Sequence, residues 1–281
     1  MRRTITDDIY CAHYSGKGYL MPPCDFTDCM AFLHTENGLV TVQMGAETVE
    51  VSKGEVLFIP DGTAAFASSS EKSSFALLRI SLSSVLSNME LLDSELFGMF
   101  LLQAKLKPYL LSEEAEHYGD AMSVLEQAKT EFSAKETCFR LCLKAHVCRL
   151  LAILLRQYSN AKKEGDRLLY HNLSRFKEAL AYAQSHMADK LTVASLSELM
   201  HLSSDYFSKM LFESTGKTAQ RYLQSVRINE AMRMFLNEDV SLNAVASSVG
   251  YGNADAFNRL FKQYVHLSLS SYAKLARHGT L

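Results

Sequence analysis

Residues 203–235 read SSDYFSKMLFESTGKTAQRYLQSVRINEAMRMF, and residues 241–272 read SLNAVASSVGYGNADAFNRLFKQYVHLSLSSY. Four positions of the first segment recur in kind fifty residues later. The pairs are Phe207 and Phe257, Lys209 and Arg259, Met210 and Leu260, and Leu211 and Phe261. Apolar residues at helical spacing, with a basic residue on the opposite side, predict two copies of one helical unit.

The first copy has the pattern of two short helices joined by a turn. Val193, Leu196 and Met200 line one side of a short helix, and the chain then turns through residues 201–203. Ser203 is expected to cap the next helix, because its hydroxyl can accept a hydrogen bond from an otherwise unpaired amide.

The second copy repeats this scheme. An apolar helix is predicted over residues 242–249, Gly250 suits a left-handed turn, and Asn253 is the expected N-cap of the following helix. Residues 219–235 predict a longer amphipathic helix between the copies. Two helix-turn-helix units in tandem indicate a protein that holds two helices against one face of a DNA duplex.

Residues 191–276, which include both quoted segments, resemble the AraC-type family of bacterial transcription regulators in their order of turn glycines, buried aromatics and basic positions. The resemblance implies a DNA-binding domain with two recognition helices. The far C-terminus departs from the family, since residues 265–269 replace the usual Phe-Gly-x-x-Pro and Tyr272-Ala273 replaces the usual Tyr-Arg. Phe212 departs as well, because the family tends to have a lysine there, and one phosphate contact is then missing.

The resemblance places seven residues on the base-facing sides of the two recognition helices. They are Asp205, Ser208, Lys209, Ala254, Asp255, Asn258 and Arg259. Their chemistry agrees, because Lys and Arg donate to guanine, Asn bridges adenine and a carboxylate accepts from cytosine. The alternative for each is a solvated position on an exposed helix face. The six apolar residues of the repeat are expected in the core.

Charge supports the same half of the chain. Residues 171–281 hold 12 Lys and Arg against 9 Asp and Glu, whereas the whole chain holds 29 against 31. Residues 1–170 therefore hold 17 against 22, so the small basic excess lies with the predicted DNA-binding half. Because the excess is modest, we expect base contacts and dimer avidity to add to phosphate binding.

The first part of the chain has the pattern of short β-strands. Residues 39–43, 47–51, 56–59 and 75–80 are rich in β-branched and aromatic residues and are separated by turn residues. Four or more such strands in series predict a small barrel, and Ser68–Ser70 are expected in a solvated loop.

A second resemblance covers about residues 10–82. The spacing Gly54-x5-Pro60-x-Gly62-x2-Ala65-x3-Ser69 is similar to the second motif of cupin barrels. Ala65 stands where the metal-binding histidine of that motif falls, and Ala31 stands where an acidic ligand falls. Because methyl groups cannot ligate a metal, we expect no metal and no cofactor. A metal-dependent cupin enzyme fused to DNA-binding helices is therefore the least favoured alternative, and we expect a protein that is not an enzyme.

In sugar-responsive members of the AraC-type family the barrel binds the small effector, and the resemblance implies a similar sensory role. The candidate effector-binding residues have aromatic or hydrogen-bonding groups on predicted strands or on the N-terminal arm. They are Tyr10, His13, Phe32, His34 and Arg79. For each of them the alternative is a structural or barrel-rim position.

The middle of the chain is predicted to be helical. One apolar stripe lies within residues 91–101 and a second within residues 141–155, and together they exceed what a small barrel can cover. We therefore expect one of them to form a homodimer interface. The predicted domains are a cupin-like barrel (1–82), a helical dimerisation segment (83–159), a linker (160–172) and a DNA-binding domain (173–281).

Cys138, Cys142 and His146 follow at intervals of four and share one helical side, where a soft metal or an oxidant could meet them. The alternative is that cysteine fills space in a buried helix. No Cys-x-x-Cys pair occurs among the six cysteines, and no apolar run suggests a secretory signal or a membrane span. We therefore expect a cytoplasmic protein with reduced thiols.

Together these patterns predict an α+β, dimeric transcription regulator that binds double-stranded DNA in two adjacent major grooves. It is expected to be an activator that contacts RNA polymerase, and a small effector in the barrel is expected to shift its population between two arrangements. The alternative is a regulator of the same type that needs no effector or is controlled by a protein partner.

Overall fold

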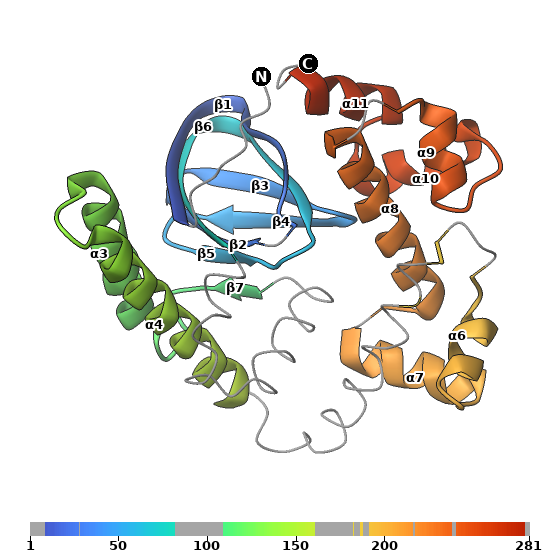
Figure 1. Ribbon diagram of the computed structural model, residues 1–281, viewed down its shortest axis with the longest axis horizontal. Helices are drawn as coiled ribbons and strands as arrows, with labels where there is room; N and C mark the ends of the chain where they lie inside the picture. The colour runs from blue at the N-terminus through green and yellow to red at the C-terminus, as the bar shows by residue number, and fades with distance from the viewer. Residues whose placement is uncertain are drawn as a thin grey trace.

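The computed structural model describes residues 9–27, 29–81, 109–160, 182, 186–187, 191–215, 217–237 and 240–278. In this part of the chain a barrel-like β-sheet lies between a helical hairpin and a C-terminal group of helices (Figure 1). This order of strands and then helices confirms the predicted α+β class.

The sheet is antiparallel and is organised around one long strand, β6. Its described strands are β1 (Ile9–Asp25), β2 (Cys29–Asn37), β3 (Leu39–Met44), β4 (Glu47–Ser52), β5 (Val56–Ile59), β6 (Ala64–Ser81) and β7 (Tyr109–Leu111). β6 pairs with β1 along one side, and along the other it pairs first with β3 and then with β2. Because β6 changes partner halfway along, the sheet curves over itself and encloses an apolar core.

The enclosed face of the sheet is filled by apolar side chains. Phe26, Leu33 and Phe75 are fully buried in this cluster, together with Ala31 and Ala65. The two alanines therefore direct methyl groups into the interior at the positions where a metal-binding cupin would have ligands. This face functions as a packed core in the described residues.

The four segments predicted as strands lie within β3, β4, β5 and β6. The solvated loop expected at Ser68–Ser70 was wrong, because these residues continue β6. Ser69 is only 6% exposed, and its hydroxyl donates to the Leu39 carbonyl oxygen at 2.7 Å. Serine is tolerated inside this strand because a backbone acceptor on β3 satisfies its hydroxyl.

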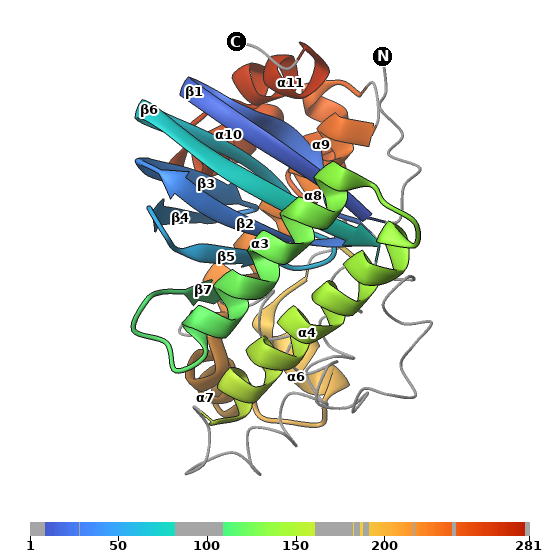
Figure 2. The same cartoon turned by 90° about the vertical axis from the view of Figure 1, so that its left-hand side faces the viewer.

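A helical hairpin covers the outer face of the sheet (Figure 2). It consists of α3 (Tyr118–Ala134) and α4 (Phe139–Asn160). The second predicted apolar stripe lies on α4, and its residues 147, 150, 151, 154 and 155 are buried against the sheet and α3, whereas Leu141 is 68% exposed. The first predicted stripe and the predicted linker lie outside the described residues, apart from position 160.

The middle segment is not wholly helical as expected, because residues 109–111 form β7. This strand pairs antiparallel with β5 through Tyr109 and Phe58, Leu110 and Leu57, and Leu111 and Val56. An open edge of β5 gains backbone partners in this way, so tertiary pairing decides the conformation of a segment too short to have a clear pattern.

The C-terminal part consists of helices with two separate apolar cores. The helices are α6 (Val193–Leu199), α7 (Ser204–Thr215), α8 (Ala219–Asn237), α9 (Leu242–Ser248), α10 (Ala254–Val265) and α11 (Leu269–His278). One core joins α6 and α7 to the start of α8, and the other joins the end of α8 to α9, α10 and α11. None of the described helices is both long and apolar enough to cross a membrane.

Candidate nucleic-acid interface and sensor seam

The first helix-turn-helix unit consists of α6 and α7. Thr192 caps α6 and accepts from the Ser195 amide at 3.1 Å. Ser203 caps α7, as predicted, because its hydroxyl accepts from the Tyr206 amide at 3.2 Å. On α7, the apolar side chains of Phe207, Met210 and Leu211 are each at most 2% exposed. The opposite side of this helix therefore faces solvent or DNA.

The second unit consists of α9 and α10. Asn253 caps α10, as predicted, and accepts from the Ala256 amide at 2.9 Å. Gly250 makes the turn with a φ of +83°, and a Cβ at this position would lie 2.6 Å from the Met187 carbonyl oxygen. Both conformation and space therefore require glycine at this turn. Phe257 and Phe261 are fully buried, as the repeat predicts.

The candidate base-reading residues lie on matched faces of α7 and α10. Asp205, Lys209, Asp255 and Arg259 are exposed, whereas the other three candidates are half-buried. Each of the pairs 205 and 255, 208 and 258, and 209 and 259 is separated by fifty residues, so the two helices present similar groups in the same order.

Asn258, one of the candidate base-reading residues, also has a structural role. The side-chain oxygen of Asn258 accepts from the Leu269 amide at 2.8 Å and so fixes the start of α11 against α10. Its amide nitrogen and the second lone pair of its oxygen can still bond to a DNA base. Asn258 is therefore a structural residue as well as a candidate for reading adenine.

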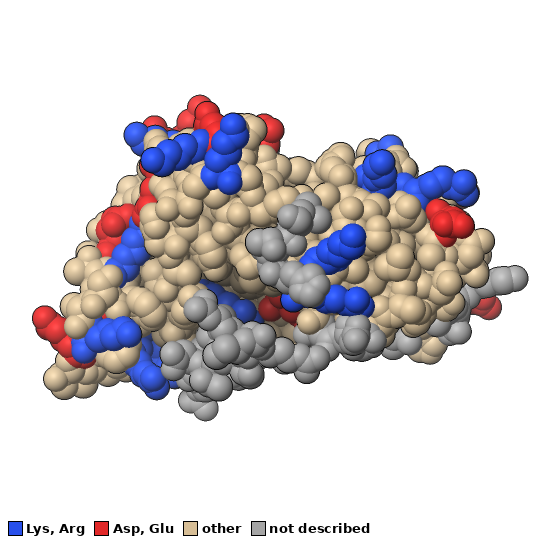
Figure 3. Space-filling model, turned by 90° about the horizontal axis from the view of Figure 1, so that it is seen from above, with Lys and Arg blue, Asp and Glu red and all other residues tan. Residues whose placement is uncertain are grey.

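The described basic side chains do not cover the face of the molecule that Figure 3 shows. In Figure 3, Lys and Arg form small groups separated by other residues, and acidic groups lie beside some of them. On this face the described basic side chains therefore form no large uniform positive field.

The second unit is docked on the barrel. Ala46, Ala64 and Phe66 of the barrel are buried in the core of this unit, and the Phe66 ring lies 6.0 Å from that of Tyr272 on α11. Gln43 donates to the Tyr264 carbonyl oxygen at 3.1 Å, at the end of α10. By contrast, the core of the first unit contains no barrel side chain among the described residues.

Polar contacts to α8 complete this docking. Asn229 bonds to the turn before β6 through Gly62 and Ala64, and Arg233 forms an ion pair of 3.3 Å with Asp25 at the end of β1. Lys217, just before α8, pairs with Glu47 of β4 at 2.8 Å. The helix that joins the two units is therefore bound to the barrel at several points.

The candidate effector residues do not converge on the barrel interior. On β2, Ala31 and Leu33 point inward, so Phe32 and His34 point outward beneath α3. Phe32 and His34 line a small cavity of about 10 Å³ together with Cys11 and Lys129. This volume is close to the least that holds one water molecule.

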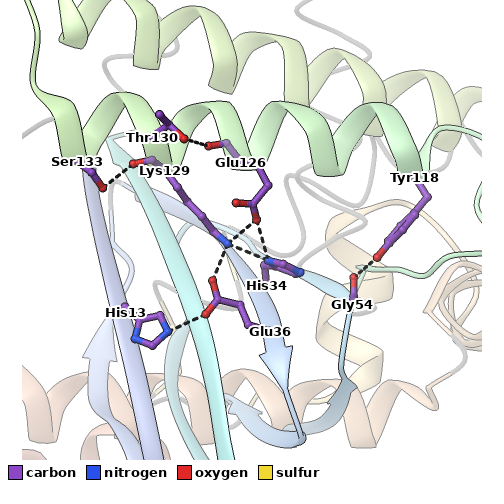
Figure 4. A network of polar contacts seen from close by, with 9 residues as sticks. All are labelled: His13, His34, Glu36, Gly54, Tyr118, Glu126, Lys129, Thr130 and Ser133. Carbon is purple, nitrogen blue, oxygen red and sulfur yellow. Dashed lines mark hydrogen bonds and ion pairs between the residues drawn. The ribbon is translucent and has the colours of Figure 1, made fainter.

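A polar network crosses the seam between the sheet and α3 (Figure 4). The Lys129 ammonium donates to Glu36 at 2.7 Å, to Glu126 at 2.8 Å and to His34 Nδ1 at 3.2 Å. Burial and the nearby Lys129 charge lower the pKa of His34, so its imidazole remains a neutral acceptor. His13 donates from the exposed end of this network to Glu36 at 2.7 Å.

The two carboxylates and the ammonium stabilise each other. Burial alone would lower the pKa of Lys129, but hydrogen bonds and charge from Glu126 and Glu36 raise it overall. Burial alone would raise the pKa of Glu36, but the Lys129 and His13 contacts lower it overall. The seam is therefore held by a charged pair that the sequence pattern did not predict, since Lys129 and Glu36 are far apart in the chain.

The two remaining effector candidates lie elsewhere. Tyr10 is half-buried, and its ring lies edge-on to Phe132 of α3 at 6.3 Å. Arg79 donates to Cys29 Sγ at 2.9 Å and to the Asp25 carbonyl oxygen at 3.2 Å. Arg79 thus ties β6 to the end of β1 and the start of β2.

The cysteine and histidine cluster of the middle segment is spread along α4. Cys138 is exposed just before the helix, whereas Cys142 and His146 are half-buried. Among the described residues, no group of three or more His, Cys, Asp or Glu has an arrangement that could hold a metal ion. The exposed Cys138 therefore does not fill space in a buried helix, whereas Cys142 is half-buried on α4.

Comparison with known proteins identifies the C-terminal fold. Residues 196–275 match the model of the helix-turn-helix domain. The chain is 34% identical over 83 residues to the uncharacterized HTH-type transcriptional regulator YobQ of Bacillus subtilis. The aligned residues make up 30% of this chain and 34% of YobQ. The chain thus spans only about a third of the length of the first curated relatives that it matches.

Other relatives extend over nearly the whole chain. The Msm operon regulatory protein of Streptococcus mutans is 21% identical over 96% of this chain and 92% of its own. A crystal structure of ToxT from Vibrio cholerae has a TM-score of 0.57 at 14% identity and covers 96% of this chain and 99% of that chain. The N-terminal barrel and the C-terminal helices therefore occur together in a known fold.

Proposed function

We propose that residues 196–275, which match the helix-turn-helix domain model, form an AraC-type DNA-binding domain, and that the whole chain is a transcription regulator that reads double-stranded DNA with α7 and α10. The observation that carries this proposal is the matched pair of recognition faces. Asp205 and Lys209 on α7 correspond to Asp255 and Arg259 on α10, and all four are exposed beside a fully packed apolar side. Two such helices, joined by α8, suit two adjacent major grooves.

The docking of the barrel supports a one-component mechanism. The second unit shares an apolar core with the barrel, whereas the first unit is connected to it through α8 and the Lys217–Glu47 pair. A change in the barrel would therefore carry the second unit with it and change its relation to the first. An effector acts on this equilibrium only if it binds one arrangement better than the other.

The seam beneath α3 is the effector site that we propose, in place of the barrel interior. It brings together Phe32, His34 and Lys129, which offer an aromatic surface, an acceptor and a charged donor. The cavity of about 10 Å³ is too small for a sugar, so an effector would have to move α3 away from the sheet. Binding would then be coupled to the position of the α3–α4 hairpin.

The same hairpin is the proposed homodimer element. Most of the apolar stripe of α4 is used within the chain, so we propose that a partner meets α4 on its outer side, around the exposed Leu141. Sedimentation of the full chain as a monomer at tens of micromolar would remove the dimer from this proposal. We further propose that the regulator acts in the cytoplasm, is not an enzyme and, as an activator, contacts RNA polymerase.

The first test is capture of fragmented genomic DNA from the source organism on the purified full chain at moderate salt, followed by sequencing. Enrichment of a few promoters that share a paired sequence supports reading by both units. Capture without enrichment, both with and without a small-molecule extract of the same cells, contradicts sequence-specific reading.

A second test separates effector control from its alternative. The thermal midpoint of the full chain is measured with sugars, fatty acids and bile-acid-like molecules, because a ligand that binds only the folded state raises apparent stability. A shift that is lost in His34→Ala but kept in an Arg79→Lys control supports the seam. No shift with any compound favours control by protein abundance or by a protein partner.

A further inference from the structure

α7 carries an exposed aromatic ring on its polar side. Phe212 is 54% exposed, and among the large apolar side chains of the described residues only Leu141 is more exposed. The apolar side of α7 is complete without it, since Phe207, Met210 and Leu211 are at most 2% exposed. The ring is therefore available for a partner outside the chain.

Helical geometry places Phe212 in the middle of the base-facing side. Successive residues of an α-helix are about 100° apart, so Phe212 lies only about 20° from Asp205 around the helix axis. Ser208 and Lys209 lie on either side of this direction, one turn earlier. The ring thus shares its face with the three residues that are proposed to meet DNA.

The internal repeat shows that the two units differ at this position. Fifty residues after Phe212 stands Lys262, which is exposed on α10. A lysine at this position has a long side chain whose ammonium group can reach a phosphate, whereas a phenyl ring offers neither charge nor hydrogen bonds. The first unit therefore has a group that needs an apolar partner where the second unit has a cation.

The major groove offers one apolar group on its base edges, the C5-methyl group of thymine. We propose that Phe212 is a specificity-determining residue that contacts a thymine methyl group in the groove read by the first unit. This inference rests on the proposed function, because it requires that α7 enters a major groove. The acidic, hydroxyl and basic neighbours of Phe212 suit base edges and phosphates better than the apolar surface of a protein partner.

The test begins with a uracil scan and needs no variant. The full chain is used to select binding sites from a random duplex library, and each thymine of the best site is then replaced singly by uracil, which lacks the methyl group. We expect one or two replacements to weaken binding by the wild-type chain about three- to tenfold, as the loss of one buried methyl group predicts.

Two substitutions assign the effect to the ring. Phe212→Ala should weaken binding to the thymine duplex by a similar factor and should no longer distinguish thymine from uracil at those positions. Phe212→Lys should also lose the distinction, but with a steeper salt dependence because a phosphate contact is gained. Lys262→Ala is the matched control, and it should lose affinity and some salt dependence while it keeps the distinction between thymine and uracil.

The outcomes separate this inference from the proposed function. If the wild-type chain selects no sequence from the library, the proposed function itself is contradicted. If it selects a site in which no thymine is sensitive to methyl removal, or if Phe212→Ala retains the wild-type sensitivity, only the role of Phe212 is overturned. A Phe212 that contacts a protein partner would give this second result.

Discussion

The side-chain amide of Asn229 donates to the carbonyl oxygen of Gly62 at 2.8 Å and thereby binds α8 to the turn before β6. Its oxygen accepts from the Ala64 amide at 2.9 Å, so one side chain satisfies both a backbone acceptor and a backbone donor. The backbone of Gly45 packs closely against the same side chain, since a Cβ at Gly45 would lie 3.0 Å from the Asn229 side-chain oxygen. The helix that joins the two recognition units therefore has a fixed point on the barrel.

Asn229→Leu should destabilise the protein. Leucine has a similar size, but it leaves the Ala64 amide and the Gly62 carbonyl without their partner in a partly buried place, which costs about 1–3 kcal/mol. Urea unfolding measures the loss. Gln220→Ala, at an exposed position of the same helix, is the control and should change stability by less than about 0.5 kcal/mol. Equal stability of Asn229→Leu and the wild-type chain would show that the contact contributes nothing.

Gly250→Ala should be among the more damaging single-methyl substitutions in the second unit. Alanine is strained at a φ of +83°, and its Cβ would meet the Met187 carbonyl oxygen at 2.6 Å. We expect a loss of roughly 1–3 kcal/mol, since the conformation and the space both oppose a side chain. The neighbouring Gly252→Ala is a matched control, because nothing lies within 4 Å of its Cβ position. Thermal unfolding compares the two variants, and similar midpoints would contradict this account of the turn.

His266→Gly should stabilise the chain. His266 ends α10 in the left-handed conformation, with a φ of 59°, at the position where the AraC-type resemblance has glycine. Glycine adopts this conformation without the steric cost of a Cβ, so we expect a gain of about 0.5–1 kcal/mol. His266→Ala provides the comparison, because it removes the imidazole but keeps the Cβ, and it should give no such gain. A thermal midpoint of His266→Gly at or below the wild-type value would contradict the argument.

The repeat made much of the DNA-binding half predictable from sequence. Ser203 and Asn253 cap α7 and α10 as expected, and Phe207 and Phe257 are buried as expected. These features depend on local hydrogen bonds and on periodicity within one helix, which a sequence shows directly. The proposed base contacts remain predictions, because exposure alone does not distinguish a reading residue from a solvated one.

The places of the candidate effector-binding residues were less predictable, because alternation along a strand does not say which face is inside. His34 and Leu33 are neighbours on β2, yet Leu33 points into the barrel and His34 points beneath α3. The salt bridge between Glu36 and Lys129 joins residues more than ninety positions apart. Such pairs form only when α3 packs on the sheet, so the periodicity within α3 or within a strand does not predict them.

The polar seam should make stability fall in mild acid. The pKa of His34 is lower in the folded protein than its ordinary value of about 6.5, so the unfolded chain binds more protons as the pH falls below that value. The pKa of Glu36 is also lowered, so its contribution is present above about pH 4.3 and is lost as the pH falls further. Stability should therefore decrease in two stages from pH 7 to pH 3.

Urea midpoints measured across this pH range check both stages. Glu36→Gln should lower stability at neutral pH and remove the more acidic stage, because the carboxylate that pairs with Lys129 and His13 is gone. His34→Gln should remove the stage near pH 6 and keep the other. Midpoints of the wild-type chain that do not change between pH 7 and pH 5 would contradict the assignment to His34.

Arg259→Ala should impair DNA reading and leave the fold intact. Arg259 is exposed on α10, on the face opposite the buried Phe257 and Phe261, so its removal leaves no cavity. If its guanidinium bridges a guanine, the variant should lose roughly 1–3 kcal/mol of specific binding. The measurement is the ratio of affinities for a captured genomic site and for random duplex DNA at fixed salt. Lys274→Ala, at an exposed position of α11, is the matched control for loss of one positive charge. An unchanged ratio for Arg259→Ala would place this residue among the solvated positions of α10, because a base contact cannot be lost without a loss of discrimination.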